Sequence, residues 1–183
     1  MARKYKTITN PAVGQSIKFL QTARDTNGDL LEMEATFDPH SKEPPQHYHP
    51  GQEENFRIIK GQMTIRMDGK IFILREGDSL HIPPNTSHSM WNNTDGQSIL
   101  NWKVTPAINT EYLLETFAGL AADGKTNANG TPKFLQLVLL ADTYEKVFRV
   151  SKPPFVIQKI LFTILKPLAY VAGYKAVYKK YFD

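Results

Sequence analysis

The spacing of apolar residues in this sequence changes from a period of two to a helical period near Pro106. Before this proline, short segments alternate apolar and polar side chains, as residues 31–37 do, and this alternation is typical of half-buried strands. After it, apolar side chains recur three and four residues apart, as in residues 111–122, which predicts helices. Many short strands followed by helices favour an antiparallel sandwich or barrel with a helical appendage.

Turn signals place the boundaries of these elements. Asp68-Gly69 lies between residues 62–67 and 70–75 and is the strongest hairpin signal in the chain. Pro167 ends, kinks or restarts the last helix. The expected helices cover residues 111–122 with Thr110 as the N-cap, then residues from the Thr131-Pro132 pair to Phe148, and finally residues that follow Pro153-Pro154.

Composition excludes several kinds of site. The 183 residues include no cysteine, so disulfides, zinc fingers, thiol nucleophiles and iron–sulfur clusters are ruled out. Residues 1–13 are not followed by the apolar stretch of a signal peptide, and no run of about 18 uncharged apolar residues predicts a spanning helix. We therefore expect a cytoplasmic location.

Three histidines and one glutamate form the candidate site. His47 and His49 are two residues apart on an extended segment, so both imidazoles project to the same face. Glu54 follows after a short turn, and His88 comes from a second stretch downstream. Three imidazoles and one carboxylate suit a divalent first-row transition metal with coordination positions left open. Glu53 is the rival carboxylate, but the six-residue gap to Gly61 favours Glu54.

These residues resemble the two motifs of the cupin superfamily. The first motif, G(X)5HXH(X)3–4E(X)6G, is matched from His47 to Gly61, with Ser41 in place of the leading glycine. The second, G(X)5PXG(X)2H(X)3N, is matched from Gly77 to Asn92, with Asn85 in place of the inner glycine. Asparagine also tolerates the left-handed turn conformation. The resemblance covers about residues 15–105, and the remainder is similar to single-domain bacterial cupins with a C-terminal helical extension.

The resemblance implies a double-stranded β-helix, or jelly-roll, barrel over residues 1–105 and a helical extension over residues 106–183 that packs on the barrel or on a second subunit. It implies His47, His49, Glu54 and His88 as the metal ligands. Fe(II) is the preferred metal, and Mn, Ni, Zn or Cu are possible. Glu54 either stays a ligand or acts as a base.

The expected function is that of a mononuclear metal enzyme, whose redox version is a dioxygenase-like enzyme that acts on an apolar or aromatic small molecule. Phe56, Met90 and Trp102 face the barrel interior by alternation and are expected to line the substrate pocket. One alternative is a small-molecule binding or sensing protein with a non-catalytic metal. Another is a protein that associates with a membrane surface through residues 153–183. This barrel hosts many chemistries, so the resemblance alone does not choose among them.

The C-terminal tail concentrates the positive charge of the protein. Residues 146–183 carry eight basic residues and one acid, for a charge of +7, whereas the whole chain carries +4. Lys159, Thr163, Lys166 and Tyr170 form a narrow polar stripe on an otherwise apolar helix. Because aliphatic residues dilute the charge, no nucleic-acid partner is expected. We expect a homodimer in which the tail packs on its own barrel and on a second subunit.

Overall fold

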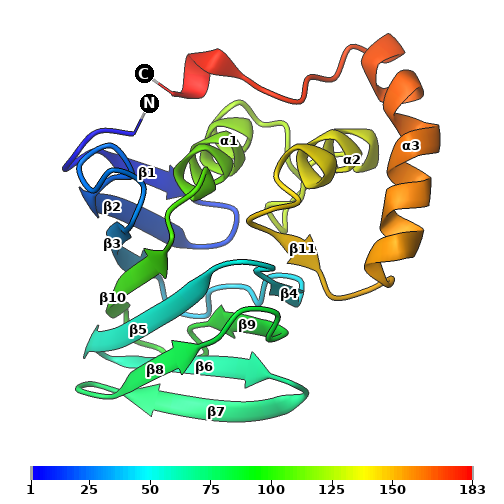
Figure 1. The fold of residues 1–183 in the computed structure, drawn as a ribbon. Coiled ribbons are helices and arrows are strands. Elements are labelled where there is room, and N and C mark those ends of the chain that lie inside the picture. Colours follow the sequence, from blue (N-terminus) through cyan, green and yellow to red (C-terminus); the bar gives the residue numbers. More distant parts are fainter. Residues whose placement is uncertain (1, 183) are drawn as a thin grey trace.

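A computed structural model describes residues 2–182. Two antiparallel sheets face each other and form the barrel, and the helices lie together on one side of it (Figure 1). One sheet has the order β1-β2-β3-β10-β5-β8 and the other the order β11-β4-β9-β6-β7. The strands are β1 (Thr7–Asn10), β2 (Gln15–Gln21), β3 (Leu31–Phe37), β4 (His47–Tyr48), β5 (Glu53–Lys60), β6 (Gln62–Met67), β7 (Lys70–Arg75), β8 (Ser79–Ile82), β9 (His88–Trp91), β10 (Ser98–Thr105) and β11 (Arg149–Val150).

The predicted mainly β jelly-roll fold is confirmed. Asp68 and Gly69 both adopt positive φ angles and join β6 to β7 in the expected hairpin. Asn85 also has a positive φ, of 63°, so it takes the conformation for which glycine is otherwise used. The apolar faces of β3, β5, β6 and β10 meet between the two sheets, and this core contains fully buried residues such as Met33, Ile65 and Leu100.

The helical extension differs from its sequence prediction in three details. The helices are α1 (Thr110–Ala122), α2 (Phe134–Thr143) and α3 (Phe155–Val171), followed by the short 3-10 helix η1 (Lys179–Tyr181). Asn109, not Thr110, occupies the N-cap position of α1, and the Thr110 hydroxyl instead accepts a hydrogen bond from Gln52 at 2.8 Å. The second helix begins at Phe134, with Lys133 at its N-cap, instead of at the Thr131-Pro132 pair, because Pro132 forms a bridge with Thr126. It ends at Thr143 instead of Phe148, because the chain turns there to form β11 against β4.

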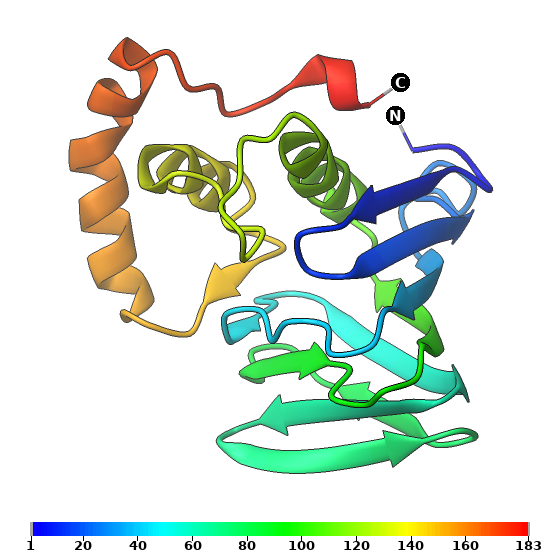
Figure 2. The same ribbon diagram turned by 180° about the vertical axis from the view of Figure 1, so that it is seen from behind.

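The two lysines of the α3 polar stripe pair with acidic residues of α2 and of the turn after it, whereas Thr163 and Tyr170 are exposed. Lys159 contacts Asp142 at 3.1 Å and Glu145 at 2.6 Å, and Lys166 contacts Asp142 at 2.7 Å. α3 packs mainly against α2 and lies outside it in both views (Figures 1 and 2), and packing of the tail on its own barrel and on a second subunit stays a prediction. Pro167 neither ends nor restarts this helix, which continues through it.

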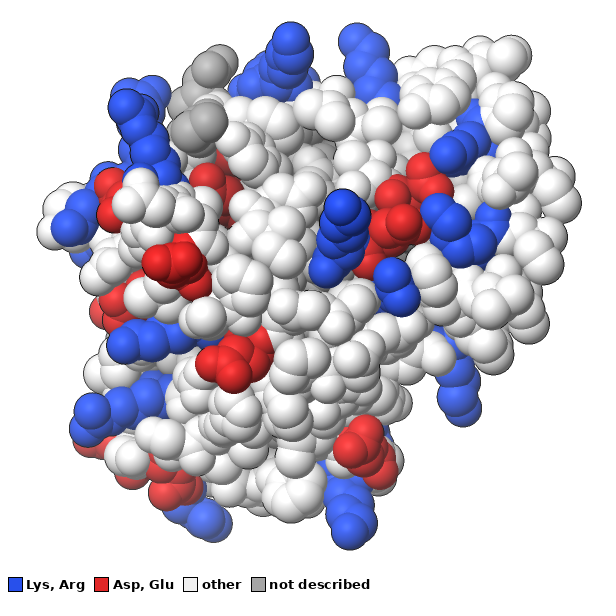
Figure 3. Space-filling view, viewed as in Figure 1, with Lys and Arg blue, Asp and Glu red and all other residues white. Residues whose placement is uncertain are grey.

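The outer face of α3 is apolar and exposed. Figure 3 shows acidic atoms enclosed by basic ones between α2 and α3, with a largely uncharged surface beyond them. Among residues 2–182, no helix is long and apolar enough to cross a membrane. The exposed apolar side chains of α3 include Val156, Ile157, Ile160, Ile164, Leu168 and Val171.

Candidate metal centre

Three strands bring the predicted ligands to one point inside the barrel. β4 carries His47 and leads directly to His49, β5 carries Glu54, and β9 carries His88. His47 and His88 are paired across β4 and β9. One ring nitrogen from each of the three histidines can be chosen so that all three atoms lie within 4.8 Å of one another.

Glu54 lies beside two of these histidines. Its Oε2 atom is 2.8 Å from His88 Nε2 and 3.2 Å from His49 Nε2. Two ligand atoms at right angles around a metal with bonds of about 2.1 Å lie about 3 Å apart, so these separations match neighbouring ligands of one ion. His49 Nε2 and Glu54 Oε2 are buried, and neither has a hydrogen bond of good geometry to the described residues.

Backbone carbonyls fix the tautomer of all three histidines. Each Nδ1 lies against a carbonyl oxygen, so Nδ1 carries the proton and Nε2 keeps its lone pair for the centre of the site. This is the arrangement that metal-binding histidines adopt. The acceptors are Pro45 for His47 at 3.0 Å, Thr86 for His88 at 2.9 Å, and Val147 for His49.

The electrostatics of the cluster favour neutral imidazole at one ligand and a carboxylate at another. Burial, together with the neighbouring His88 and His49, lowers the pKa of His47 to about 3. Burial opposes ionisation of Glu54, but His49 and His88 outweigh it and hold the pKa of this carboxyl well below its usual range. The pKa of His49 is raised. Burial alone would lower this pKa, but the adjacent Glu54 carboxylate outweighs the effect of burial.

The donor set therefore fits a divalent first-row metal ion. Three imidazole nitrogens lie within 4.8 Å of one another, with a carboxylate oxygen beside two of the rings, and borderline metals prefer such nitrogen and oxygen ligands. The two buried atoms without a well-formed hydrogen bond, on His49 and Glu54, would be satisfied by an ion at that centre.

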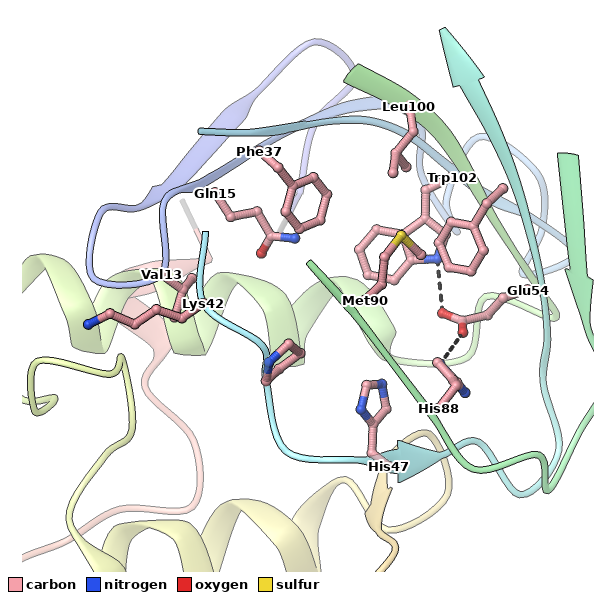
Figure 4. A pocket seen from close by; sticks show the side chains of 12 residues that line it. Val13, Gln15, Phe37, Lys42, His47, Glu54, His88, Met90, Leu100 and Trp102 are labelled. Atoms are coloured by element: carbon pink, nitrogen blue, oxygen red, sulfur yellow. Dashed lines mark hydrogen bonds and ion pairs between the residues drawn. The ribbon is translucent and has the colours of Figure 1, made fainter. Parts of the chain in front are cut away.

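A small apolar cavity opens beside this cluster. Its volume is about 110 Å³, and His47, Glu54 and His88 form one end of it. The Phe56 and Trp102 rings stack at 5.8 Å to form part of its wall. Figure 4 shows the lining, which includes the three side chains expected from sequence, Phe56, Met90 and Trp102, and further residues that were not expected: Val13, Gln15, Phe37, Lys42, Pro44 and Leu100.

Two of the unexpected lining residues are polar. The amide of Gln15 points toward the cavity, whereas Lys42 extends away from it (Figure 4). The Lys42 ammonium binds the Ala128 carbonyl and, at 3.2 Å, the Asn129 side chain. Lys42 therefore ties the loop after α1 to the rim and contributes its aliphatic stem to the cavity.

The other histidines and Glu53 lie outside the cluster. His40 pairs with Asp95 at 2.8 Å on the surface, and the exposed His81 contacts Asn55 at 3.0 Å. The Glu53 side chain is 43% exposed and lies 3.9 Å from His81. Of the two adjacent glutamates, the structure thus directs Glu54 inward.

Sequence reasoning missed two neighbours of the predicted ligands, Val147 and Phe148, and one contact of the expected pocket residue Trp102. Trp102 donates its Nε1–H to Glu54 Oε1 at 2.9 Å, so it does more than line the pocket. Phe148 stacks on His47, and the Val147 carbonyl accepts from His49. Alternation places Trp102 on the inner face, but no local signal relates residues 147–148 to histidines about 100 positions earlier.

Comparison with known proteins identifies the barrel. Residues 33–102 match the Cupin domain family. This chain carries a cupin domain. The matched residues run from the third residue of β3 to the fifth residue of β10, and they include all four candidate ligands.

Curated relatives of this cupin include oxidoreductases. A probable oxidoreductase of Hypocrea virens is 28% identical over 151 residues, which cover 76% of this chain and 68% of that protein. The quercetin 2,3-dioxygenase of Bacillus subtilis is 33% identical over 72 residues, covering 39% of this chain but only 21% of the enzyme. Among solved structures, an RmlC-like cupin from Shewanella frigidimarina is 24% identical with a TM-score of 0.48, covering 57% of this chain and 86% of that one.

Proposed function

We propose that this cupin is a mononuclear metal-dependent oxidoreductase of the dioxygenase type that acts on a small apolar or aromatic molecule. The observation that carries the proposal is the end wall of the cavity, where His47, Glu54 and His88 face an otherwise apolar space. An enzyme of this type needs metal ligands that leave room for a substrate beside the ion. The relatives named above, which include a probable oxidoreductase and a quercetin dioxygenase, support the same reaction class.

His47, His49 and His88 would hold the ion through Nε2, with Glu54 as the fourth ligand. A divalent transition metal, Fe(II) by preference and otherwise Mn, Ni, Zn or Cu, would supply Lewis acidity there, and each of these except Zn would also supply redox chemistry. Trp102 holds one carboxylate oxygen of Glu54 and leaves the other directed at the histidines. This hydrogen bond favours a fixed ligand role for Glu54 and makes its release as a base depend on breaking the contact with Trp102.

The cavity limits the substrate class. A volume of about 110 Å³ is well below the roughly 300–1,000 Å³ of pockets for drug-sized ligands. A single ring or a short aliphatic chain is therefore the largest substrate that this cavity would enclose. The Phe56–Trp102 stack offers an apolar wall, and the Gln15 amide offers one hydrogen-bonding group to orient it. The Lys42 ammonium is bound to residues 128–129, so no lining cation faces the substrate.

The small cavity also supports a second candidate function. A binding or sensing protein with a non-catalytic metal needs only a ligand-sized space beside the ion. Oxygen consumption separates the two candidates, because a binder retains its ligand unchanged whereas an oxygenase consumes one substrate with each oxygen molecule.

The test is oxygen uptake by the Fe(II)-loaded full chain with single-ring phenols. The proposal expects uptake that depends on both Fe(II) and substrate and that is lost in His88→Ala but retained in the surface variant His81→Ala. Binding of a phenol without oxygen uptake or product formation would favour the sensing function over the enzyme.

A further inference from the structure

A short segment of the helical extension runs beside the strand that carries His47. β11 pairs with β4, which places Val150 opposite His47, and the Ser151 N–H donates to the Gln46 carbonyl at 2.9 Å. On its other side, β4 is joined to β9 only by the pair formed by His47 and His88. Because so short a strand has little stability of its own, β11 supplies much of the backbone pairing that holds the first two histidines.

The same segment contacts both of these imidazole rings. The Val147 carbonyl accepts the Nδ1–H of His49. The Phe148 ring stacks on His47 with the ring centroids 4.7 Å apart and the planes 25° from parallel. The first contact fixes the tautomer and orientation of one ring, and the second restricts rotation of the other.

Phe148 is held in this place by the helical layer. It also lines a second apolar cavity, of about 240 Å³, between α1, α2 and α3. Further along the segment, the Ser151 hydroxyl lies 2.5 Å from that of Ser87, the residue before His88. Residues 147–151 therefore contact the surroundings of all three histidines.

We infer that Val147 and Phe148 are positioning residues of the metal centre, so that the helical extension is a part of this site and not a separate appendage. The inference rests on the proposed metal-dependent function. Groups that orient metal-binding histidines commonly change metal affinity 10–100-fold when they are altered. The barrel alone leaves His49 without its Nδ1 acceptor and one face of His47 uncovered.

The test measures Co(II) binding to the full chain by competition with a coloured chelator. Phe148→Leu keeps an apolar side chain but loses the ring plane, so Co(II) affinity is expected to fall about 10–100-fold, with a changed visible absorption spectrum of the bound ion. Phe148→Tyr keeps the ring and is expected to restore both the affinity and the spectrum. The matched control is Phe134→Leu, since Phe134 lines the same cavity but is 63% exposed.

Wild-type affinity and an unchanged spectrum in Phe148→Leu would overturn the positioning role. If circular dichroism shows that this variant is unfolded, Phe148→Met is measured in its place, because methionine adapts to irregular apolar gaps. His88→Ala separates the two proposals. Retained Co(II) binding in His88→Ala contradicts the metal centre itself. Loss of Co(II) in His88→Ala, combined with normal binding in the Phe148 variants, contradicts only the positioning inference.

Discussion

At the scale of single residues, each proposed ligand is held by a hydrogen bond to a group outside the set of four. All three Nδ1 atoms are engaged by backbone carbonyls, and one oxygen of Glu54 is engaged by Trp102. These contacts leave the remaining donor atoms directed at one another across the site. Preorganised ligands lose little conformational freedom on binding an ion, and this increases metal affinity.

Replacing Trp102 with phenylalanine tests the contact to Glu54. Trp102→Phe keeps an aromatic wall but removes the Nε1–H donor, so Glu54 Oε1 loses its partner. We expect metal affinity to fall about 10-fold or more while the fold is retained. The control is Trp91→Phe, because Trp91 projects from β9 to the opposite face from Met90. Equal metal affinity in Trp102→Phe and wild type would show that this hydrogen bond does not position Glu54.

Asn92 has a structural role that a stability measurement can test. Its side-chain amide donates to the carbonyls of Phe37, Asp38 and Gly96, and it is fully buried. Asn92→Ala leaves these acceptors without that donor and is expected to lower the free energy of unfolding by roughly 1–3 kcal/mol. Urea unfolding measures this, with the exposed Asn93→Ala as the control. A loss of metal affinity without a loss of stability would instead assign Asn92 to the site.

At the scale of elements, periodic segments were predictable and short pairings were not. The alternation of β3 and the turn at Asp68-Gly69 specify their strands locally, because side-chain direction and turn conformation depend on adjacent residues. β4 and β11 contain two residues each, too few to show a period. Their pairing depends on tertiary contacts, so the end of α2 and the contacts of Val147 and Phe148 could not be predicted from sequence.

In the candidate site, too, some residues could be predicted from local spacing and others could not. His47 and His49 project together because they are two positions apart, and Glu54 and His88 follow from the spacing of the two motifs. Gln15 and Lys42 reach the cavity from the first position of β2 and from the chain between β3 and β4. Their placement depends on how these segments pack beside the cluster, which residue spacing does not specify.

Asp142 couples the docking of α3 to pH. Burial opposes ionisation of Asp142, but Lys166 and Lys159 outweigh it and lower its pKa. The folded chain thus binds this proton more weakly than the unfolded chain. The stabilising contribution is present above the unfolded pKa of about 3.9 and is lost as the pH falls through the lower folded value.

We therefore expect thermal stability to fall more steeply between about pH 4 and pH 2 in wild type than in Asp142→Asn. Thermal unfolding followed by circular dichroism across this pH range measures the difference. The control is Asp29→Asn, because Asp29 is exposed in the turn before β3. Parallel pH profiles for wild type and Asp142→Asn would contradict the coupling.

At the scale of the whole molecule, α3 exposes the face that soluble helices normally bury. Its two lysines bind α2, so the outer face holds side chains such as Ile164, 66% exposed, and Val171, 86% exposed. Contiguous exposed apolar surface of this kind marks an interaction site. We propose that this face contacts a second copy of the chain in a homodimer, and a membrane surface is the alternative partner.

Ile164→Glu tests this surface. A charge in the centre of an apolar interface is costly, so the variant is expected to be monomeric at concentrations where wild type is dimeric. Light scattering after size exclusion gives the molecular mass, and Val177→Glu, which lies outside α3, is the control. A wild-type monomer that binds anionic vesicles, with binding weakened by salt, would replace the dimer by the membrane alternative.

The central claim is that four side chains from three parts of the barrel bind one transition-metal ion. The direct measurement is the metal content, by mass spectrometry, of protein purified without added metal. We predict about one transition-metal ion per chain in wild type and in the surface variant His81→Ala, and little in His88→Ala. Wild-type protein without metal that also fails to take up Fe(II), or a His88→Ala variant with full metal content, would contradict the account.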